Sequence, residues 1–175
     1  MKNTLIKACS ILGILILVNA CGTVPESRSH YIQLVKEKQG SGVGPFKVLV
    51  FSKTITQPFD AVFNNIDDKL QGCVPGGYQS TTMRGSSTST LRVANNDRIE
   101  KVAPGKAEVT IQQYHSGTVM QSEGGFYLLA ADVQALDADS VRLDFYTAKH
   151  YIAIAEAIEQ WANGSDKCHG IGGNP

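Results

Sequence analysis

The residues that could do chemistry in this chain are scattered along its length. The four histidines are His30, His115, His150 and His169, and no two of them share a motif. His150 is the strongest candidate for a functional histidine, because it lies beside Tyr151 at the junction of a predicted strand and a predicted helix. A histidine at such a position is more often an exposed or hydrogen-bonded structural residue than a catalytic one.

The short motifs that mark common active sites are missing. The chain has no G-x-S-x-G nucleophile elbow, no P-loop, no dinucleotide-binding glycine pattern and no H-E-x-x-H pair. The sequence therefore predicts a protein that is not an enzyme and that uses no cofactor. A hydrolase assembled around His150 by groups that converge from distant parts of the chain remains as an alternative.

Two groups of carboxylates could also do chemistry. Asp60, Asp67 and Asp68 fall between the apolar positions of a predicted helix, so they are interpreted as its solvated face rather than as an acid/base pair. Asp137 and Asp139 could be Ca²⁺ ligands, but the EF-hand loop pattern is absent and an Asx turn explains both residues more simply.

The first twenty residues have the pattern of an export signal. Lys2 and Lys7 form a basic start, and Ala8–Val18 is an apolar stretch of the length found in signal peptides. That stretch is too short to span a bilayer, which takes about 20 residues. We expect residues 1–20 to be removed during export.

The end of this segment, Leu17-Val18-Asn19-Ala20-Cys21, resembles the lipobox of bacterial lipoproteins. An aliphatic residue stands three places before the cysteine and a small one directly before it, although Asn19 occupies a position where the family prefers a small residue. The resemblance implies cleavage after Ala20, diacylation of Cys21 and a permanent anchor in the lipid bilayer. Gly22 in place of Asp implies transport to the outer membrane. A plain signal peptide, cleaved after Ala20 and followed by a coincidental cysteine, is the alternative.

Export and lipidation would leave two cysteines. Cys9 is lost with the leader and Cys21 carries lipid, so Cys73 and Cys168 remain in an oxidising compartment, where a disulfide is the default. Closing a loop of about 100 residues would stabilise the fold by about 4 to 5 kcal/mol in the chain-entropy model. A metal site made of Cys73, Cys168 and His169 is the weaker reading, because it has too few ligands.

Composition argues against a nucleic-acid partner. The whole chain of 175 residues has 16 basic and 16 acidic residues, and cleavage removes two lysines, which leaves a slight acidic excess. The remaining length suits one domain. We expect residues 21–45, which end in a glycine-rich stretch, to be the lipidated N-terminus with a flexible tether, and residues 46–175 to be a single globular domain.

Two amphipathic helices are predicted in this domain. Apolar residues recur at helical spacing from Phe59 to Cys73 and again from Tyr151 to Ala162. Trp161 is the only tryptophan, and its spacing from Ile158 favours a place in the core over a ligand site.

The remaining segments read as strands. Phe46–Phe51 is apolar and β-branched, which predicts a central first strand, and Arg84–Ser87 is a predicted hairpin turn. Further strands are expected on both sides of that turn within 78–93 and at 98–102, 107–111, 126–135 and 141–146. The order of elements predicts an α+β fold, a two-layer sandwich with an antiparallel sheet of about five to seven strands and both helices on one face. It loosely resembles helix-grip domains, in which a curved sheet wraps a C-terminal helix; element order alone transfers no site.

Three functions are compatible with these patterns. The leading hypothesis is a non-catalytic envelope lipoprotein, anchored through Cys21, that docks on another envelope protein. The alternative is a periplasmic module that binds an apolar or amphipathic molecule between sheet and helix, which a fully packed interior would count against. A hydrolase would need a polar cleft in which His150 meets an acidic or hydroxyl partner.

Overall fold

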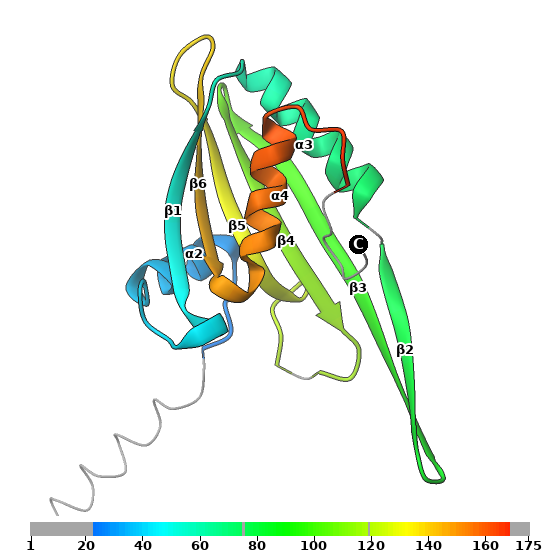
Figure 1. Cartoon of the computed structure of the whole chain (residues 1–175). Coiled ribbons are helices and arrows are strands. Elements are labelled where there is room, and N and C mark those ends of the chain that lie inside the picture. The colour runs from blue at the N-terminus through cyan, green and yellow to red at the C-terminus, as the bar shows by residue number, and fades with distance from the viewer. Residues whose placement is uncertain (1–22, 75, 119, 169–175) are drawn as a thin grey trace, which may run out of the picture.

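The computed structural model describes residues 23–74, 76–118 and 120–168, and Figure 1 shows the arrangement of their elements. Six antiparallel strands form one sheet in the order β1-β6-β5-β4-β3-β2. Their bounds are β1 Val48–Ile55, β2 Gly77–Arg84, β3 Ser87–Ala103, β4 Lys106–His115, β5 Phe126–Ala135 and β6 Val141–Ala148. The helices are α2 Arg28–Glu37, α3 Phe59–Cys73 and α4 Ile152–Ala162, with short 3₁₀ turns η2 Gly44–Phe46 and η3 Lys149–Tyr151. The predicted α+β sandwich is confirmed.

The strand register defines two ends of the sheet. Val48 at the start of β1 pairs with Ala148 at the end of β6, and Gln113 near the end of β4 pairs with Phe126 at the start of β5. We call this the proximal end. The turns that join β3 to β4 and β5 to β6 lie at the opposite, distal end.

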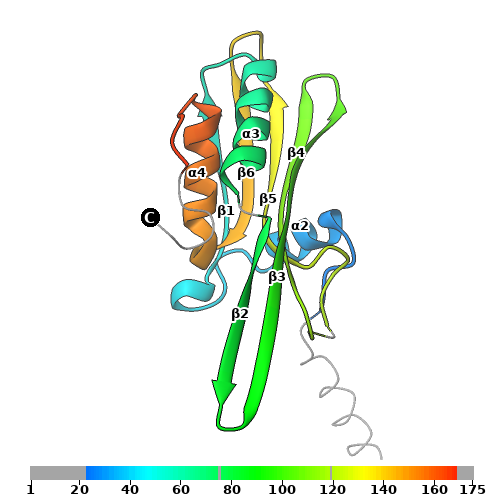
Figure 2. The same cartoon turned by 90° about the vertical axis from the view of Figure 1, so that its right-hand side faces the viewer.

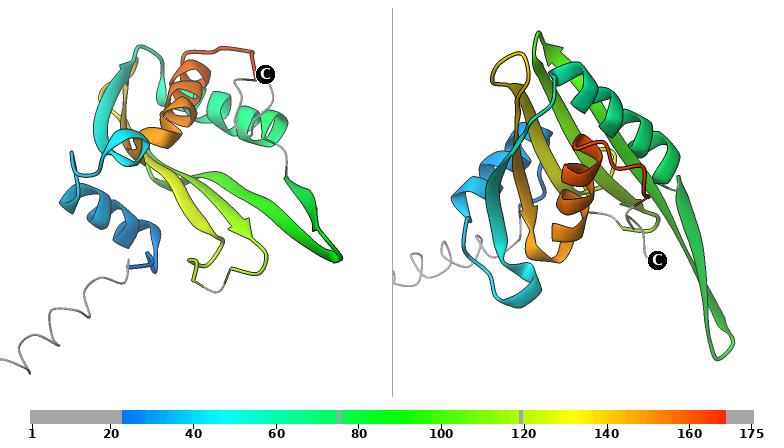
Figure 3. Two further views of the ribbon diagram at one scale, coloured as in Figure 1. Left: turned by 60° about the horizontal axis from the view of Figure 1, so that its bottom comes forward. Right: turned by 45° about the horizontal axis from the view of Figure 1, so that its top comes forward.

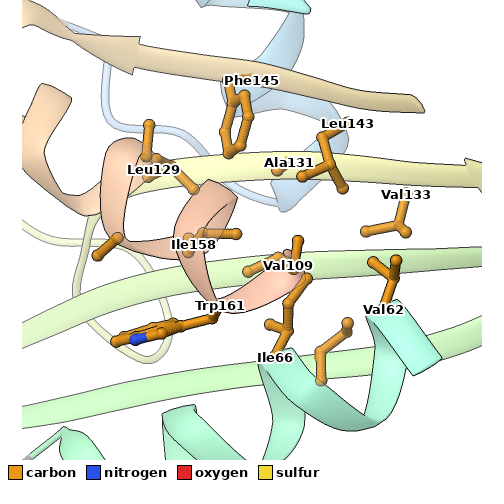
Figure 4. Close-up of a cluster of buried hydrophobic side chains, with 14 of the residues drawn as sticks. Val62, Ile66, Val109, Leu129, Ala131, Val133, Leu143, Phe145, Ile158 and Trp161 are labelled. Carbon is orange, nitrogen blue, oxygen red and sulfur yellow. The ribbon is translucent and has the colours of Figure 1, made fainter. Parts of the chain in front are cut away.

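The face of the sheet that carries α3 and α4 holds the main core (Figures 1 and 4). Both helices have an apolar stripe at the spacing that the sequence predicted, and both stripes point at the strands. Trp161 and Phe145 are fully buried there. The other labelled members of this core are Val62, Ile66, Val109, Leu129, Ala131, Val133, Leu143 and Ile158. The prediction that Trp161 is a core residue is confirmed.

The first strand differs from the expectation. We expected a central strand from its apolar composition, whereas β1 lies at the edge of the sheet and pairs only with β6 among the described strands. The apolar composition of β1 has another cause, because helices cover both faces of the sheet at this strand. Phe51 stacks on Phe145 on the core side, while Val48 and Val50 pack on the α2 side.

The expectation of a flexible tether over residues 21–45 was wrong for its central part. Arg28–Glu37 forms a helix that packs on the sheet face opposite α3 and α4, as Figure 3 shows. The Ser27 hydroxyl accepts a hydrogen bond from the His30 amide and begins the helix. Ile32 and Val35 are buried against the sheet. The helix is weakly amphipathic, so its stability depends on this packing.

Candidate functional site

The most distinctive feature of the molecule is a long hairpin at one edge of the sheet. Figures 1 and 2 show that it projects past the other loops of the proximal end. Its cause is a difference in strand length: β3 has 17 residues, of which β4 pairs only with those from Val93 onward. Residues Ser87–Leu91 pair with β2 alone, whereas Arg92 also exchanges hydrogen bonds with Ser116. We call Gly77–Arg92 the arm. The predicted turn at Arg84–Ser87 forms its tip, and Gly85 there has a φ of +63°.

The arm has hydrogen-bonding edges without described neighbours. β2 is the last strand of the sheet, and Ser87–Leu91 of β3 has no strand on its other side within the described part of the chain. Natural proteins usually block such edges with lysine, proline, bulges or short strands. The arm contains no lysine, proline or acidic residue, its charged residues are Arg84 at the tip and Arg92 at the base, and its two strands pair without a register shift. Its edges are therefore open to strand addition.

The surface of the arm is polar, with a few apolar side chains. It is rich in serine and threonine, and the hydroxyl oxygens of Thr81 and Thr90 are 3.4 Å apart across the strands. Arg92 donates from Nε to the Gln79 side-chain oxygen at 3.2 Å. The apolar exceptions are Met83, 76% exposed, Tyr78, 54% exposed, and Leu91, 36% exposed. Little of the arm is buried, so the fold gains little from its side chains.

A second cluster fixes the N-terminal segment to the sheet. Arg28 donates to the Ala131 carbonyl oxygen at 2.7 Å and to Asp132 Oδ1 at 2.6 Å, and it is paired with Glu108 at 3.2 Å. The Ser122 hydroxyl, in the loop between β4 and β5, donates to the carbonyl oxygen of Pro25 at 2.5 Å. The Ser122 bond places Pro25 at the proximal end, directly before α2, whereas the Arg28 side chain reaches the distal halves of β4 and β5.

Aromatic rings complete the packing of α2. Tyr31 stacks on Tyr127 with ring centroids 4.9 Å apart, and burial raises the pKa of the Tyr31 hydroxyl. Burial, together with the Asp132 carboxylate, raises the pKa of Tyr146 to about 12, and its hydroxyl donates to Asp132 Oδ2 at 3.2 Å. Both hydroxyls therefore stay protonated at neutral pH.

A half-buried carboxyl group lies near the base of the arm. Asp97 accepts a hydrogen bond at Oδ1 from the Gln112 amide at 3.1 Å, whereas its buried Oδ2 has no hydrogen-bond partner within the described residues. Burial raises the pKa of Asp97 to about 6. It borders a hollow of about 160 Å³ together with Leu70, Val74, Gly76 and Asn95. A carboxyl group with such a pKa can exchange protons, but no described histidine or nucleophile hydrogen-bonds to it.

The histidines do not converge on a site. His30 accepts a bond at Nδ1 from the Glu26 amide at 3.3 Å, and His115 Nε2 is 2.8 Å from the Gln113 side-chain oxygen. His150 is exposed, and its ring makes an edge contact with the Tyr151 ring, with ring centroids 4.8 Å apart. None of its described contacts is a hydrogen bond to an acid or a hydroxyl. His169 lies outside the described residues. The arrangement that a hydrolase would require is not found around His150 in this part of the chain.

The carboxylates that the sequence singled out have ordinary partners. Asp60 is paired with Lys101 at 2.7 Å, and Asp67 accepts from the Gln71 side chain at 3.0 Å. Asp68 is exposed on the same helix. Asp137 accepts a bond from the Asp139 amide at 2.9 Å, which is the expected Asx turn. Among the described residues, no group of three histidine, cysteine or acidic side chains is arranged to hold a metal ion.

The cysteines fall into two sets. Cys73, at the end of α3, and Cys168, after α4, have Sγ atoms 2.14 Å apart and Cα atoms 5.1 Å apart, the separation of a disulfide. The link would fasten the tail behind α4 to the end of α3. Ala20 and Cys21, the predicted cleavage and lipidation positions, lie outside the described residues. No helix within 23–168 is long and apolar enough to cross a membrane.

The hollows of the described surface are not cavities in the core. One of about 700 Å³ lies at the distal end beside Phe59, Pro104 and Asp137, and another of about 640 Å³ lies between Arg28, Arg98 and Glu123. The space between the sheet and helices α3 and α4 is filled by the core side chains (Figure 4). The described core therefore leaves no room for a ligand cavity of the helix-grip kind.

Comparison with known proteins adds little. No protein-family model matches the chain, and no curated protein matches it. Two solved structures of norcoclaurine synthase from Thalictrum flavum align with it, a point mutant with a transition state analogue and a complex with dopamine and hydroxybenzaldehyde. The first is 13% identical, covers 66% of this chain and 93% of that chain, and has a TM-score of 0.29. The second is 14% identical, covers 66% and 82%, and has a TM-score of 0.25. Such low scores carry no argument about fold or function.

Sequence reasoning missed Arg28 and Asp97. Arg28 lies in the segment interpreted as a tether, and its only signal was a basic residue followed by Tyr31, Ile32 and Val35 at partial helical spacing. Asp97 lies between Asn96 and Arg98 in a polar run, where no pattern marks one side chain as buried. The arm was predicted as a hairpin, but its projection was not.

Proposed function

We propose that this protein is a lipid-anchored component of the bacterial envelope that acts by binding another envelope protein, and that the arm is its docking element. The single observation that carries the proposal is the arm: a projecting hairpin with open edges that has no lysine, proline, acidic residue or bulge, and whose charged residues are Arg84 and Arg92. A strand of the partner would add to β2 or to the Ser87–Leu91 edge of β3, where main-chain hydrogen bonds supply affinity. The lipobox-like segment supports the anchor at Cys21, on the periplasmic side of the outer membrane.

The other two readings have less support. A module for apolar ligands would need room between the sheet and α4, and that interior is filled by Trp161, Phe145 and their neighbours. A hydrolase would need partners around His150, whose ring is exposed and contacts only the neighbouring Tyr151 ring among the interactions described.

The docking proposal is tested by site-specific photo-cross-linking in living cells. A photoreactive amino acid replaces Thr82 on the arm in the otherwise intact chain, with Cys21 unchanged. The matched control replaces Thr54, an exposed threonine on β1, the edge strand at the other side of the sheet. We expect the probe at position 82 to join the protein to one envelope protein, and the same pair to form when the probe is placed on that partner.

A variant with a shortened arm provides a second test of the docking proposal. Replacing Thr81–Thr90 by a two-residue turn between the paired Ser80 and Leu91 should abolish the cross-linked partner and change the melting temperature little, because the removed side chains that the structure describes are exposed. Equal capture from positions 82 and 54, or a partner that still binds the shortened chain, would contradict the proposal.

The anchor is tested separately. Cys21→Ala should release the exported protein from the membrane fraction, and mass analysis of the wild-type N-terminal peptide should show acyl chains on Cys21. A Cys21→Ala protein that stays with the membrane after carbonate washing would show that Cys21 is not the anchor.

A further inference from the structure

The loop that follows α2 gathers positive charge and exposed apolar side chains at the proximal end. Phe46 is 73% exposed and Val43 is 82% exposed, although both are apolar. Lys38 and Lys47 are exposed on the same loop, and Lys149 is exposed on η3. We call these five residues the basic patch.

Backbone hydrogen bonds hold the basic patch together. The Lys149 amide donates to the Lys47 carbonyl oxygen at 2.7 Å, which joins η3 to the loop. The Gly40 amide donates to the Val48 carbonyl oxygen at 3.0 Å and closes the loop at its base. Gly42 has a φ of +86°, and a side chain there would clash with the Phe46 carbonyl oxygen, so this turn requires glycine. The patch is therefore a built surface.

The charges of the basic patch have no described counter-ions. The salt bridges of the described residues use Lys53, Lys69 and Lys101 but not Lys38, Lys47 or Lys149. The one carboxylate on the adjoining helix end is Glu37, which accepts a hydrogen bond from Gln33. Three ammonium groups without a salt bridge to any described residue, beside exposed Phe and Val side chains, form the pattern of a surface that binds anionic lipid headgroups.

The position of the predicted anchor indicates the same occupant. Pro25 is held by Ser122 at the proximal end, and Cys21 precedes it by only four residues. Four residues reach at most about 14 Å when fully extended, so a lipid on Cys21 would keep this end of the domain at the bilayer surface. Figures 1 and 2 show the loop of the basic patch and the start of α2 at the same end of the molecule.

We infer that the basic patch is a membrane-contact surface that binds anionic phospholipid headgroups, with Phe46 and Val43 entering the headgroup region. The inference deepens the proposed function and rests on it for the anchor at Cys21. Two contacts with the bilayer, one covalent and one electrostatic, would fix the orientation of the domain. The arm, which points from the same end, would then lie close to the membrane and meet a partner embedded there.

The test removes the anchor so that only the patch can bind. The mature chain from residue 21 to 175, with Cys21→Ser, contains every described residue and is sedimented with vesicles of phosphatidylethanolamine and phosphatidylglycerol, or with vesicles of phosphatidylcholine alone. We expect binding to the anionic vesicles that weakens with salt, and little binding to the neutral ones. K47E/K149E should lower the partition coefficient at least about tenfold, since each lysine near such a surface contributes about fivefold.

A matched control keeps the charge change and moves it elsewhere. K106E/K167E alters two exposed lysines outside the patch by the same net charge and should lower the partition coefficient far less than K47E/K149E. Circular dichroism should show the same fold for all variants. No binding to anionic vesicles, equal loss from both double variants, or a cross-link from position 46 to a protein in place of vesicle binding would overturn the inference. Failure of this test leaves the Cys21→Ala result standing, so the two proposals fail separately.

Discussion

The two faces of the sheet are covered in different ways. On one face, α3 and α4 bury a continuous apolar core in which Trp161, Phe145 and Ile158 are fully enclosed. On the other, α2 contributes Ile32 and Val35 to a small cluster with Ala130 and Tyr146, and Arg28 adds polar contacts. The first face is stabilised by a large apolar area, and the second by a smaller one together with a few directional bonds.

This difference teaches which part of the molecule can open by itself. Local unfolding free energies follow the number of buried apolar contacts, so α2 should detach before the sandwich unfolds. Because α2 directly follows the predicted anchor, its attachment sets how far the domain can move from the membrane. Four variants test the comparison.

The largest effect is expected in the core. Trp161→Ala removes a fully buried ring and its Nε1 hydrogen bond to the Lys167 carbonyl oxygen, 2.9 Å long. The free energy of unfolding should fall by about 4 kcal/mol. Urea unfolding followed by circular dichroism measures it, with Leu136→Ala, at a half-exposed position, as a control that should change little. A loss below about 1 kcal/mol would mean that this face is not the main source of stability.

The second effect concerns the link between the two helices of this core. Replacing Cys73 and Cys168 by serine should lower the free energy of unfolding by about 3 kcal/mol, because the unfolded chain loses a large closed loop. This loss is smaller than the chain-entropy figure because unfolded chains retain some structure. Mass analysis of the non-reduced wild-type protein should find the two peptides joined. Free thiols in protein extracted from the envelope under alkylating conditions would refute the disulfide.

The third effect separates the two faces. Arg28→Ala removes charge-assisted hydrogen bonds to Asp132 and Ala131, and should destabilise the attachment of α2 by about 2 kcal/mol. Hydrogen exchange should then speed up in Arg28–Glu37 while amides of the β4 and β5 core keep their protection. Arg28→Lys should restore the protection of this helix only in part, since one ammonium group cannot reproduce the forked hydrogen bonds of the guanidinium. Equal acceleration in β5 would show that the two faces unfold together.

The smallest expected effect is an increase, not a decrease, in the free energy of unfolding. Since the pKa of Asp97 is raised from 3.8 to about 6, the folded state binds more protons than the unfolded state between these values. The contribution of Asp97 to stability is therefore greatest below pH 4 and is lost as the pH rises through about 6. Asp97→Asn should be more stable than the wild type above pH 6, by about 1 kcal/mol after allowance for solvent screening. Urea unfolding across this pH range checks it, and a variant that is less stable at pH 7 would contradict the burial argument.

Much of the α3 and α4 face could be predicted from the sequence. The periods of Val62, Ile66 and Leu70, and of Ile154, Ile158 and Trp161, are local patterns that any helix with one buried side must show. The turn at Gly85 and the Asx turn at Asp137 were predictable for the same reason, because a turn depends on adjacent residues.

The candidate site was less accessible to such reasoning. The N-terminal helix is too weakly amphipathic to be recognised without the sheet that it covers, and the apolar residues of β1 on both faces were taken as a sign of a central strand. Arg28 acquires its role only because Ala131 and Asp132 lie opposite it in β5. Such contacts join residues about 100 positions apart, and no local pattern encodes them.

By itself, the sequence determined the α+β class, the two core helices, the hairpins and the prediction of an anchor at Cys21, because each follows from the type and spacing of neighbouring residues. Only the tertiary structure decided that α2 covers the second face and that Asp97 is partly buried. It also decided that β3 extends beyond β4, so that the outer edges of the arm have no neighbouring strand in the described part of the chain. The physical reason is that burial and open edges depend on which strands lie side by side and where each ends, and long-range packing sets both.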